Sequence, residues 1–160
     1  MWLKFSNCST SGSGPMLLDA NLLLYAVDED SPHHDSARSW LTDTLRGDRR
    51  VALPWQTIGA FVRIITHPRV TAHPLSGSQA WSIVADLLDV PVCWIPPTGD
   101  RTARILGSLI ERYGLTGNAI PDAQLAALAI EHGLSVISAD TDFARISEVT
   151  WHNPLRQAHS

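Results

Sequence analysis

The chain has 160 residues, a balanced apolar and polar composition and a formal net charge of −4. This length suits one globular domain that builds its own hydrophobic core. The negative charge excludes a protein that coats nucleic acid through general basicity, but specific RNA chemistry stays open. The two cysteines, Cys8 and Cys93, form neither a CxxC pair nor a disulfide framework, which fits a reducing compartment.

The start of the chain differs from the rest in composition. Residues 1–15 contain STSGSGP, which is typical of a linker, and Met16 could itself be a start codon. We interpret 1–15 as a flexible leader or a cloning remnant, 16–156 as one domain and 157–160 as a tail. No apolar run approaches the ~20 residues that span a membrane, and no signal peptide is evident. We therefore expect a cytoplasmic protein without a membrane segment.

Beyond the leader, apolar periodicity and turn residues predict alternating strands and helices. In chain order we expect a strand at 16–18, helices at 20–27 and 31–47, a strand at 49–54, helices at 55–68 and 76–90, a strand at 92–96, helices at 99–114 and 121–133, a strand at 134–138, a short helix at 140–146 and an edge strand at 148–152. Ser31 is the expected N-cap of the second helix, with Pro32 at its first position and Gly47 after its end. Pro121 and Gly133 bound the helix before the fourth strand in the same way.

This alternation predicts an α/β domain with a central parallel sheet flanked by helices on both faces. Ligands of such sheets bind beyond the carboxyl ends of the strands. Asp19 directly follows the first predicted strand, and Asp140 and Asp142 follow the fourth. These acids share one rim of the sheet if the two strands are neighbours.

Each of these acids also has an ordinary interpretation. Asp122 lies in the first turn of a helix, where the helix dipole favours a carboxylate. Asp140 and Asp142 are typical turn or cap residues. Asp19 is different, because an acid in the apolar run MLLDANLLLYA needs a partner or a metal. Acids gathered on one rim favour a metal pocket, and oxygen ligands favour Mg²⁺ or Mn²⁺, which would support hydrolysis of a phosphodiester.

Four segments together resemble the PIN-domain ribonucleases, in particular the VapC-type toxins of prokaryotic toxin–antitoxin pairs. They are LLDANLLLYA, FVRIITHPRV, GNAIPDAQLAALAIEHG and VISADTDFARI, and the similarity runs from Met16 to about Pro154. It implies a compact α/β homodimer that uses Mg²⁺ or Mn²⁺ to cleave structured RNA, such as tRNA or rRNA, and that binds a VapB-type antitoxin. It also implies catalytic and metal-binding roles for Asp19, Asp122 and Asp140, metal binding by Asp142 and polar support from Asn21 and Ser138.

The sequence departs from the family pattern at one point. The family usually has a glutamate in the helix after the second strand, but WQTIGAFVRI contains no acid. Ile58 or Ala60 occupies the expected position, while Gln56 and Thr57 are neutral oxygen donors nearby. Fewer carboxylates would weaken metal binding or remove a second metal site. A non-catalytic PIN-like module that binds RNA or protein therefore remains the alternative to the nuclease.

Other site classes are less well supported. Phosphoaspartyl proteins also place an acid after the first strand, but they use a lysine, and the single lysine, Lys4, lies in the leader. Neither His33 with His34 nor His67 with His73 has the spacing of zinc ligands, so we assign no zinc.

Two further groups of residues have open roles. The arginines can contact phosphates or form solvated faces and ion pairs. Four tryptophans lie within predicted helices or strands, and we expect them in the core or an interface rather than as stacking platforms for bases. They are Trp40, Trp55, Trp81 and Trp94.

Overall fold

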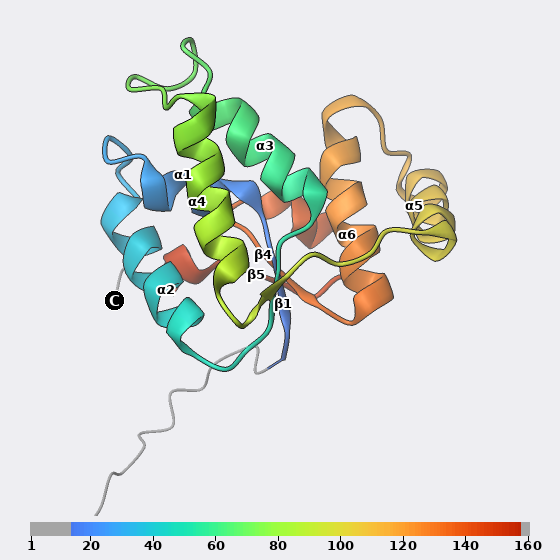
Figure 1. Ribbon diagram of the computed structural model, residues 1–160. Coiled ribbons are helices and arrows are strands. Elements are labelled where there is room, and N and C mark those ends of the chain that lie inside the picture. The colour runs from blue at the N-terminus through green and yellow to red at the C-terminus, as the bar shows by residue number, and fades with distance from the viewer. Residues whose placement is uncertain (1–13, 158–160) are drawn as a thin grey trace, which may run out of the picture.

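The computed structural model describes residues 14–157, which form a parallel sheet covered by helices on both faces (Figure 1). The strands are β1 (Met16–Leu18), β2 (Val51–Ala52), β3 (Cys93–Trp94), β4 (Ser135–Ile137) and β5 (Trp151–His152). Their order is β3-β2-β1-β4-β5, and every neighbouring pair is parallel. The predicted fold class is confirmed, and β1 and β4 are neighbours, as a shared acidic rim requires.

The helices follow the predicted series closely. They are α1 (Ala20–Val27), α2 (His34–Arg46), α3 (Trp55–Ile65), α4 (Gly77–Asp89), α5 (Asp100–Tyr113) and α6 (Ile120–His132). Three 3₁₀ helices complete the chain: η1 (Gly117–Ala119), η2 (Thr141–Arg145) and η3 (Pro154–Gln157). Gly114 and Gly133 end α5 and α6 with φ values of 59° and 66°, a conformation that glycine adopts without strain.

The central strand β1 is apolar throughout because both of its faces are covered. Met16 and Leu18 contribute to a core cluster with α1, α3 and α4, whereas Leu17 faces a second cluster built with α6. All three side chains are fully buried. Strands buried on both faces lose the usual polar alternation, so short apolar runs are enough to identify them.

Helix α6 is buried on two sides. Leu125 and Leu128 pack toward the sheet, while Ala123 and Ala127 belong to a third cluster with Leu109 of α5. Helix α5 accordingly lies outside α6, away from the sheet (Figure 1). This layering explains why α6 is apolar around most of its circumference, and it fixes the first turn of α6 at the rim of the sheet.

Helix α2 begins later than predicted. We expected Ser31 to cap it, but the helix starts at His34. The Ser31 hydroxyl instead accepts a hydrogen bond from the backbone N–H of His33 at 3.2 Å, and the His34 N–H donates to the Ser31 carbonyl at 3.0 Å. This local turn occupies the residues that would otherwise form the first helical turn.

The tryptophan prediction was wrong in part. Trp40 and Trp94 pack against core clusters, but Trp55 and Trp81 are 58% and 47% exposed. Both exposed residues lie on helix faces directed away from the sheet core, so a place in the core is excluded for them. A place in an interface remains a prediction.

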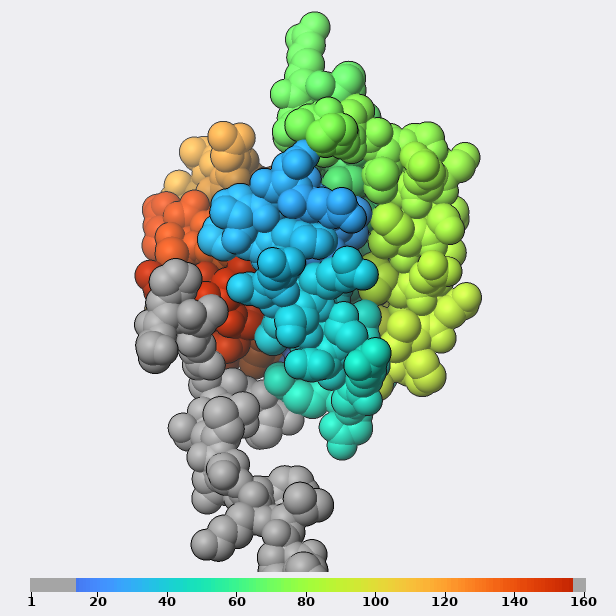
Figure 2. Space-filling model, turned by 90° about the vertical axis from the view of Figure 1, so that its left-hand side faces the viewer, coloured from blue at the N-terminus to red at the C-terminus, as the bar shows by residue number. Residues whose placement is uncertain are grey.

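One loop projects from the body of the molecule. Residues 66–76, between α3 and α4, project from the body in both overall views (Figures 1 and 2). In Figure 2, α1 and α2 form a continuous surface between α4 and the C-terminal segment. Val70 in the loop is 64% exposed.

The predicted boundaries of the domain remain predictions. Within the leader, the structure describes only Gly14 and Pro15, so its expected flexibility and the positions of Lys4 and Cys8 lie outside the described residues. The same holds for most of the predicted tail at 157–160. Within residues 14–157, no helix has the length and apolar character needed to cross a membrane.

Candidate active site

Asp19 lies where β1 passes into α1. Its backbone N–H still donates to the Ile137 carbonyl of β4 at 3.0 Å, while its side chain already caps α1. One carboxylate oxygen, Oδ1, accepts a hydrogen bond from the Ala20 N–H at 2.7 Å. The end of the strand and the start of the helix therefore fix the position of this acid.

Two polar side chains join Asp19 to the end of β4. Ser138 is fully buried, and its hydroxyl donates to Asp19 Oδ2 at 2.6 Å. The Asn21 amide donates to the same oxygen at 3.2 Å and to Ser138 Oγ at 2.9 Å, and its own oxygen accepts from the Ala139 N–H at 3.2 Å. The structure thus brings Asn21 and Ser138 into direct contact with Asp19, which fits the supporting role that we predicted.

The other three predicted acids form a cluster. Asp122 lies in the first turn of α6, and Asp140 caps η2, where its Oδ1 accepts the Asp142 N–H at 2.8 Å. One carboxylate oxygen from each of the three lies within 4.8 Å of the others. Asp19 lies outside this close group, although the Asp140 N–H and Asp19 share the Ser138 hydroxyl as a partner.

The charges of neighbouring acids and burial act on Asp122 and Asp19. Burial raises the pKa of Asp122 to about 6, with further increases from the charges of Asp19, Asp140 and Asp142. The pKa of Asp19 is also raised, chiefly by burial and slightly by Asp140, although hydrogen bonds from Ser138 and Ala20 oppose the increase. A cation between these groups would relieve both the repulsion and the raised pKa values.

In the part of the chain that the structure describes, the site offers such a cation only oxygen ligands. Within residues 14–157, the ion pairs are His73–Asp30, Arg112–Glu148 and His132–Glu131, so none of the four acids is in one. Grouped carboxylates without a protein cation fit a hard divalent ion such as Mg²⁺ or Mn²⁺. The residues present are therefore suitable for the predicted metal.

Helix α3 contacts the same rim of the sheet, but it contributes no acidic residue to the site. Thr57 is buried, and its hydroxyl donates to the Leu18 carbonyl at 2.7 Å, directly before Asp19. Ile58 packs in the core with α1, and Ala60 lies against the same cluster. The Gln56 Oε1 atom is buried and has no hydrogen-bond partner in the described part of the chain. The missing family acid is thus replaced by neutral contacts at the base of the site.

Two residues that the sequence did not suggest lie beside the acids. Tyr113 and Arg145 line a small pocket of about 30 Å³ together with Asp122, Asp142 and Ile146. Leu115 and Ala119 complete its mainly apolar wall, and a pocket of this size is about as large as one water molecule. Arg145 belongs to the DTDFARI segment and could have been suspected from its place three residues after Asp142, whereas Tyr113 lies in another part of the sequence and gave no signal.

Replacing Ser138 tests whether it supports Asp19. We expect Ser138→Ala to weaken Mn²⁺ binding by about 10- to 100-fold, as loss of an outer partner of a metal ligand commonly does. We also expect it to cost about 1–3 kcal/mol of unfolding free energy, because Asn21 and the Asp140 N–H lose a buried acceptor. Calorimetry and urea unfolding measure the two effects.

Ser108→Ala is the matched control, because that hydroxyl is exposed and contacts only the carbonyl of Arg104. Unchanged Mn²⁺ affinity in a folded Ser138→Ala variant would show that Ser138 does not support the metal site.

Comparison with known proteins identifies the family of the chain. The PIN domain model matches residues 16–149. Ribonuclease VapC37 of Mycobacterium tuberculosis is 40% identical over 138 residues, covering 86% of this chain and 96% of that protein. Ribonuclease VapC33 of the same species is 38% identical over 139 residues, covering 87% and 97%. The solved structure of VapBC2 from Rickettsia felis shares the fold, with a TM-score of 0.63 at 19% identity and coverage of 86% and 97%. The chain therefore belongs to the PIN-domain family, within its VapC-type branch.

Proposed function

We propose that this chain is a metal-dependent endoribonuclease, the toxin of a VapBC-type toxin–antitoxin pair. The observation that carries the proposal is the cluster of Asp122, Asp140 and Asp142, whose oxygens lie within 4.8 Å of one another and form no ion pair with a side chain of residues 14–157. The names of the relatives, which are ribonucleases at 38–40% identity, support the same reaction class.

The four acids have distinct parts in this proposal. Asp122, Asp140 and Asp142 bind Mg²⁺ or Mn²⁺, and Asp19 completes the site from the end of β1. The ion, when bound, supplies an ionised water and stabilises the leaving oxygen of a phosphodiester. Ser138 and Asn21 hold the Asp19 carboxylate in one orientation through their hydrogen bonds. Because these partners are fixed before RNA binds, little reorganisation is required during the reaction.

The proposal also names the partners. The substrate is structured RNA such as tRNA or rRNA, which places the protein in the cytoplasm. A cognate VapB-type antitoxin would inhibit it, and a small reading frame just upstream of the gene is the simplest observation to seek. The chain would act as a homodimer, which sedimentation of the purified protein can measure.

The absent acid in α3 favours one competing function. A PIN-like module with too few ligands would bind RNA or protein without cleaving RNA. Thr57 and Ile58 occupy the first turns of α3 with a neutral hydrogen bond and core packing, respectively, so they add no charge to the site. The two functions differ in whether the chain binds a divalent ion.

Titration calorimetry with Mn²⁺ separates the two functions. We expect binding at or below roughly millimolar Mn²⁺, and we expect the same protein to cleave RNA only when the metal is present. Asp86→Asn, which removes an exposed carboxylate from α4, is the matched control and should bind Mn²⁺ normally. No detectable heat at millimolar Mn²⁺, together with RNA binding but no cleavage, would favour the module.

A further inference from the structure

Arg145 is the cationic side chain that lines the pocket beside the acidic cluster. It shares this pocket with Asp122 and Asp142. Despite this proximity, Arg145 forms no ion pair, and its guanidinium donates no hydrogen bond, to any residue from 14 to 157. An exposed guanidinium beside carboxylates that it does not neutralise is available to an external anion.

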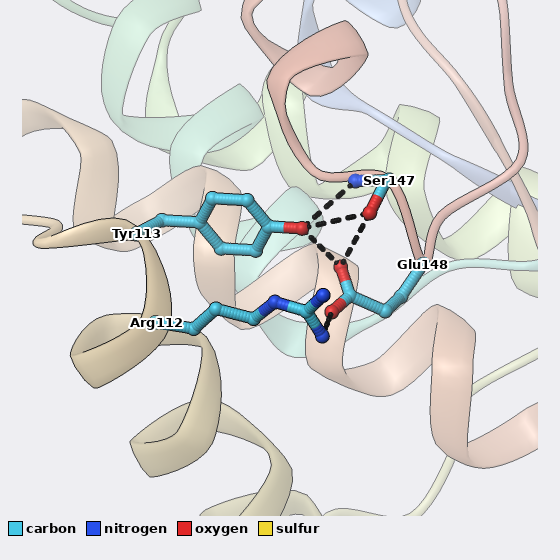
Figure 3. Close-up of polar contacts among 4 residues, drawn as sticks. All are labelled: Arg112, Tyr113, Ser147 and Glu148. Atoms are coloured by element: carbon cyan, nitrogen blue, oxygen red, sulfur yellow. Dashed lines mark hydrogen bonds and ion pairs between the residues drawn. The ribbon is translucent and has the colours of Figure 1, made fainter.

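Glu148 is the first acid after Arg145 in the sequence, and both of its carboxylate oxygens already accept hydrogen bonds. Glu148 Oε1 accepts a hydrogen bond from Arg112 at 2.6 Å, and Glu148 Oε2 accepts one from the Tyr113 hydroxyl at 2.5 Å (Figure 3). The Tyr113 contact and the Arg112 charge lower the pKa of Glu148, so it stays ionised and paired. Glu148 is therefore held by α5 and does not compete for Arg145.

The same contacts hold the backbone beside Arg145. The Tyr113 oxygen accepts the Ser147 N–H at 3.1 Å and lies 2.9 Å from the Ser147 hydroxyl (Figure 3). The Arg112 guanidinium also lies 5.7 Å from the centre of the Tyr113 ring. We name these four residues, Arg112, Tyr113, Ser147 and Glu148, the α5 clamp. The clamp ties the end of α5 to the segment that immediately follows Arg145, while Ile146 between them is buried in the core.

We infer that Arg145 contacts a backbone phosphate of the RNA at the acidic pocket. This inference rests on the proposed ribonuclease function and names a substrate contact that the acids cannot make. A phosphate approaching several carboxylates is repelled until a cation is nearby, and a planar guanidinium donates two parallel hydrogen bonds to phosphate oxygens. The clamp keeps Arg145 beside the pocket and keeps Glu148 away from it.

Binding of RNA without metal tests this contact independently of catalysis. The probe is a fluorescein-labelled RNA hairpin with a single-stranded loop in excess chelator, titrated with wild type and Arg145→Ala at several salt concentrations. We expect affinity to fall about tenfold, equivalent to 1.4 kcal/mol. The slope of log K against log salt should decrease by about 0.7, the contribution of one phosphate contact on a single strand. Arg145→Lys should recover part of the affinity, because it keeps the charge but loses the planar geometry.

Two matched controls separate a specific contact from general charge. Arg104→Ala removes an exposed arginine from α5, nine residues before Tyr113 and so about 13 Å away along the helix. It should leave binding unchanged. Tyr113→Phe removes the hydroxyl that holds Ser147 and Glu148 beside Arg145 and should weaken binding by a smaller factor, whereas Tyr25→Phe on α1 should have no effect.

Equal affinities for wild type and Arg145→Ala, or equal losses for Arg145→Ala and Arg104→Ala, would overturn the inference. Neither result bears on the ribonuclease proposal, which depends on Mn²⁺-dependent cleavage by the wild type. Conversely, a wild type that shows the expected Arg145 effect but never cleaves RNA with Mn²⁺ would refute the proposed reaction and leave the phosphate contact intact.

Discussion

Asp122→Asn is expected to lower Mn²⁺-dependent RNA cleavage by more than about 100-fold, beyond the usual effect of losing an outer partner of a metal ligand. The reason is that Asp122 belongs to the close cluster of three carboxylates, and an amide keeps the size of the side chain but removes the charge that binds a cation. Gel assays of a labelled RNA, with protein purified free of contaminating nuclease, measure the rate. Asp19→Asn should also lose most activity.

The variant should remain folded. The pKa of Asp122 is raised to about 6 by burial and by its acidic neighbours, so its charged form is unfavourable in the metal-free protein. Removing the charge therefore leaves the melting temperature in chelator unchanged or higher. Asp86→Asn serves as the control for a general loss of charge. Full cleavage by both Asp122→Asn and Asp19→Asn would refute the acidic pocket as the active site.

Metal removal should abolish cleavage, and acidic pH should reduce its rate. A carboxylate binds a divalent ion only after it loses its proton. Since the pKa of Asp122 is about 6, we expect metal-supported cleavage to fall by up to about tenfold per pH unit below that value. Rates measured from pH 5 to pH 8 at fixed Mn²⁺, and again in chelator, test both statements. A cleavage rate that does not change with pH around pH 6 would contradict the role of Asp122 as a metal ligand.

The same pKa sets the sign of the stability change. In chelator, Asp122 binds its proton more tightly in the folded chain than in the unfolded chain. Its contribution to stability is therefore fully present below the ordinary value of 3.8 and is lost as pH rises through about 6. Mn²⁺ should reverse this trend and raise the melting temperature most above pH 6. Thermal melts with and without metal show the effect, and Asp122→Asn should reduce both changes.

Much of the fold follows from local sequence because the strands are buried on both faces. MLL and SVI need no polar alternation, and glycines at 114 and 133 end their helices in the left-handed conformation. The start of α2 was predicted wrongly because the Ser31 hydroxyl can serve a turn or a cap, and the sequence does not distinguish them. The exposure of Trp55 and Trp81 depends on which helix face meets the core, which apolar content alone does not determine.

The sequence also predicted which edge of the sheet carries the candidate site, but not the detailed arrangement of its side chains. The parallel order of β1 and β4 places Asp19 and Asp140 on one rim, as strand ends imply. Sequence could not show that Asp19 stands apart from the close cluster, because that depends on the hydrogen bonds of Ser138. The α5 clamp was also beyond prediction, since its partners lie 34 to 36 residues apart.

The contact between Ser138 and Asp19 joins residues 119 positions apart in the chain. Both β4 and the segment that carries Asp140 and Asp142 are synthesised long after Asp19. A nascent chain on the ribosome therefore holds Asp19 without its partners and has no complete acidic pocket. The four acids therefore come together only after β4 and η2 have been synthesised and have folded.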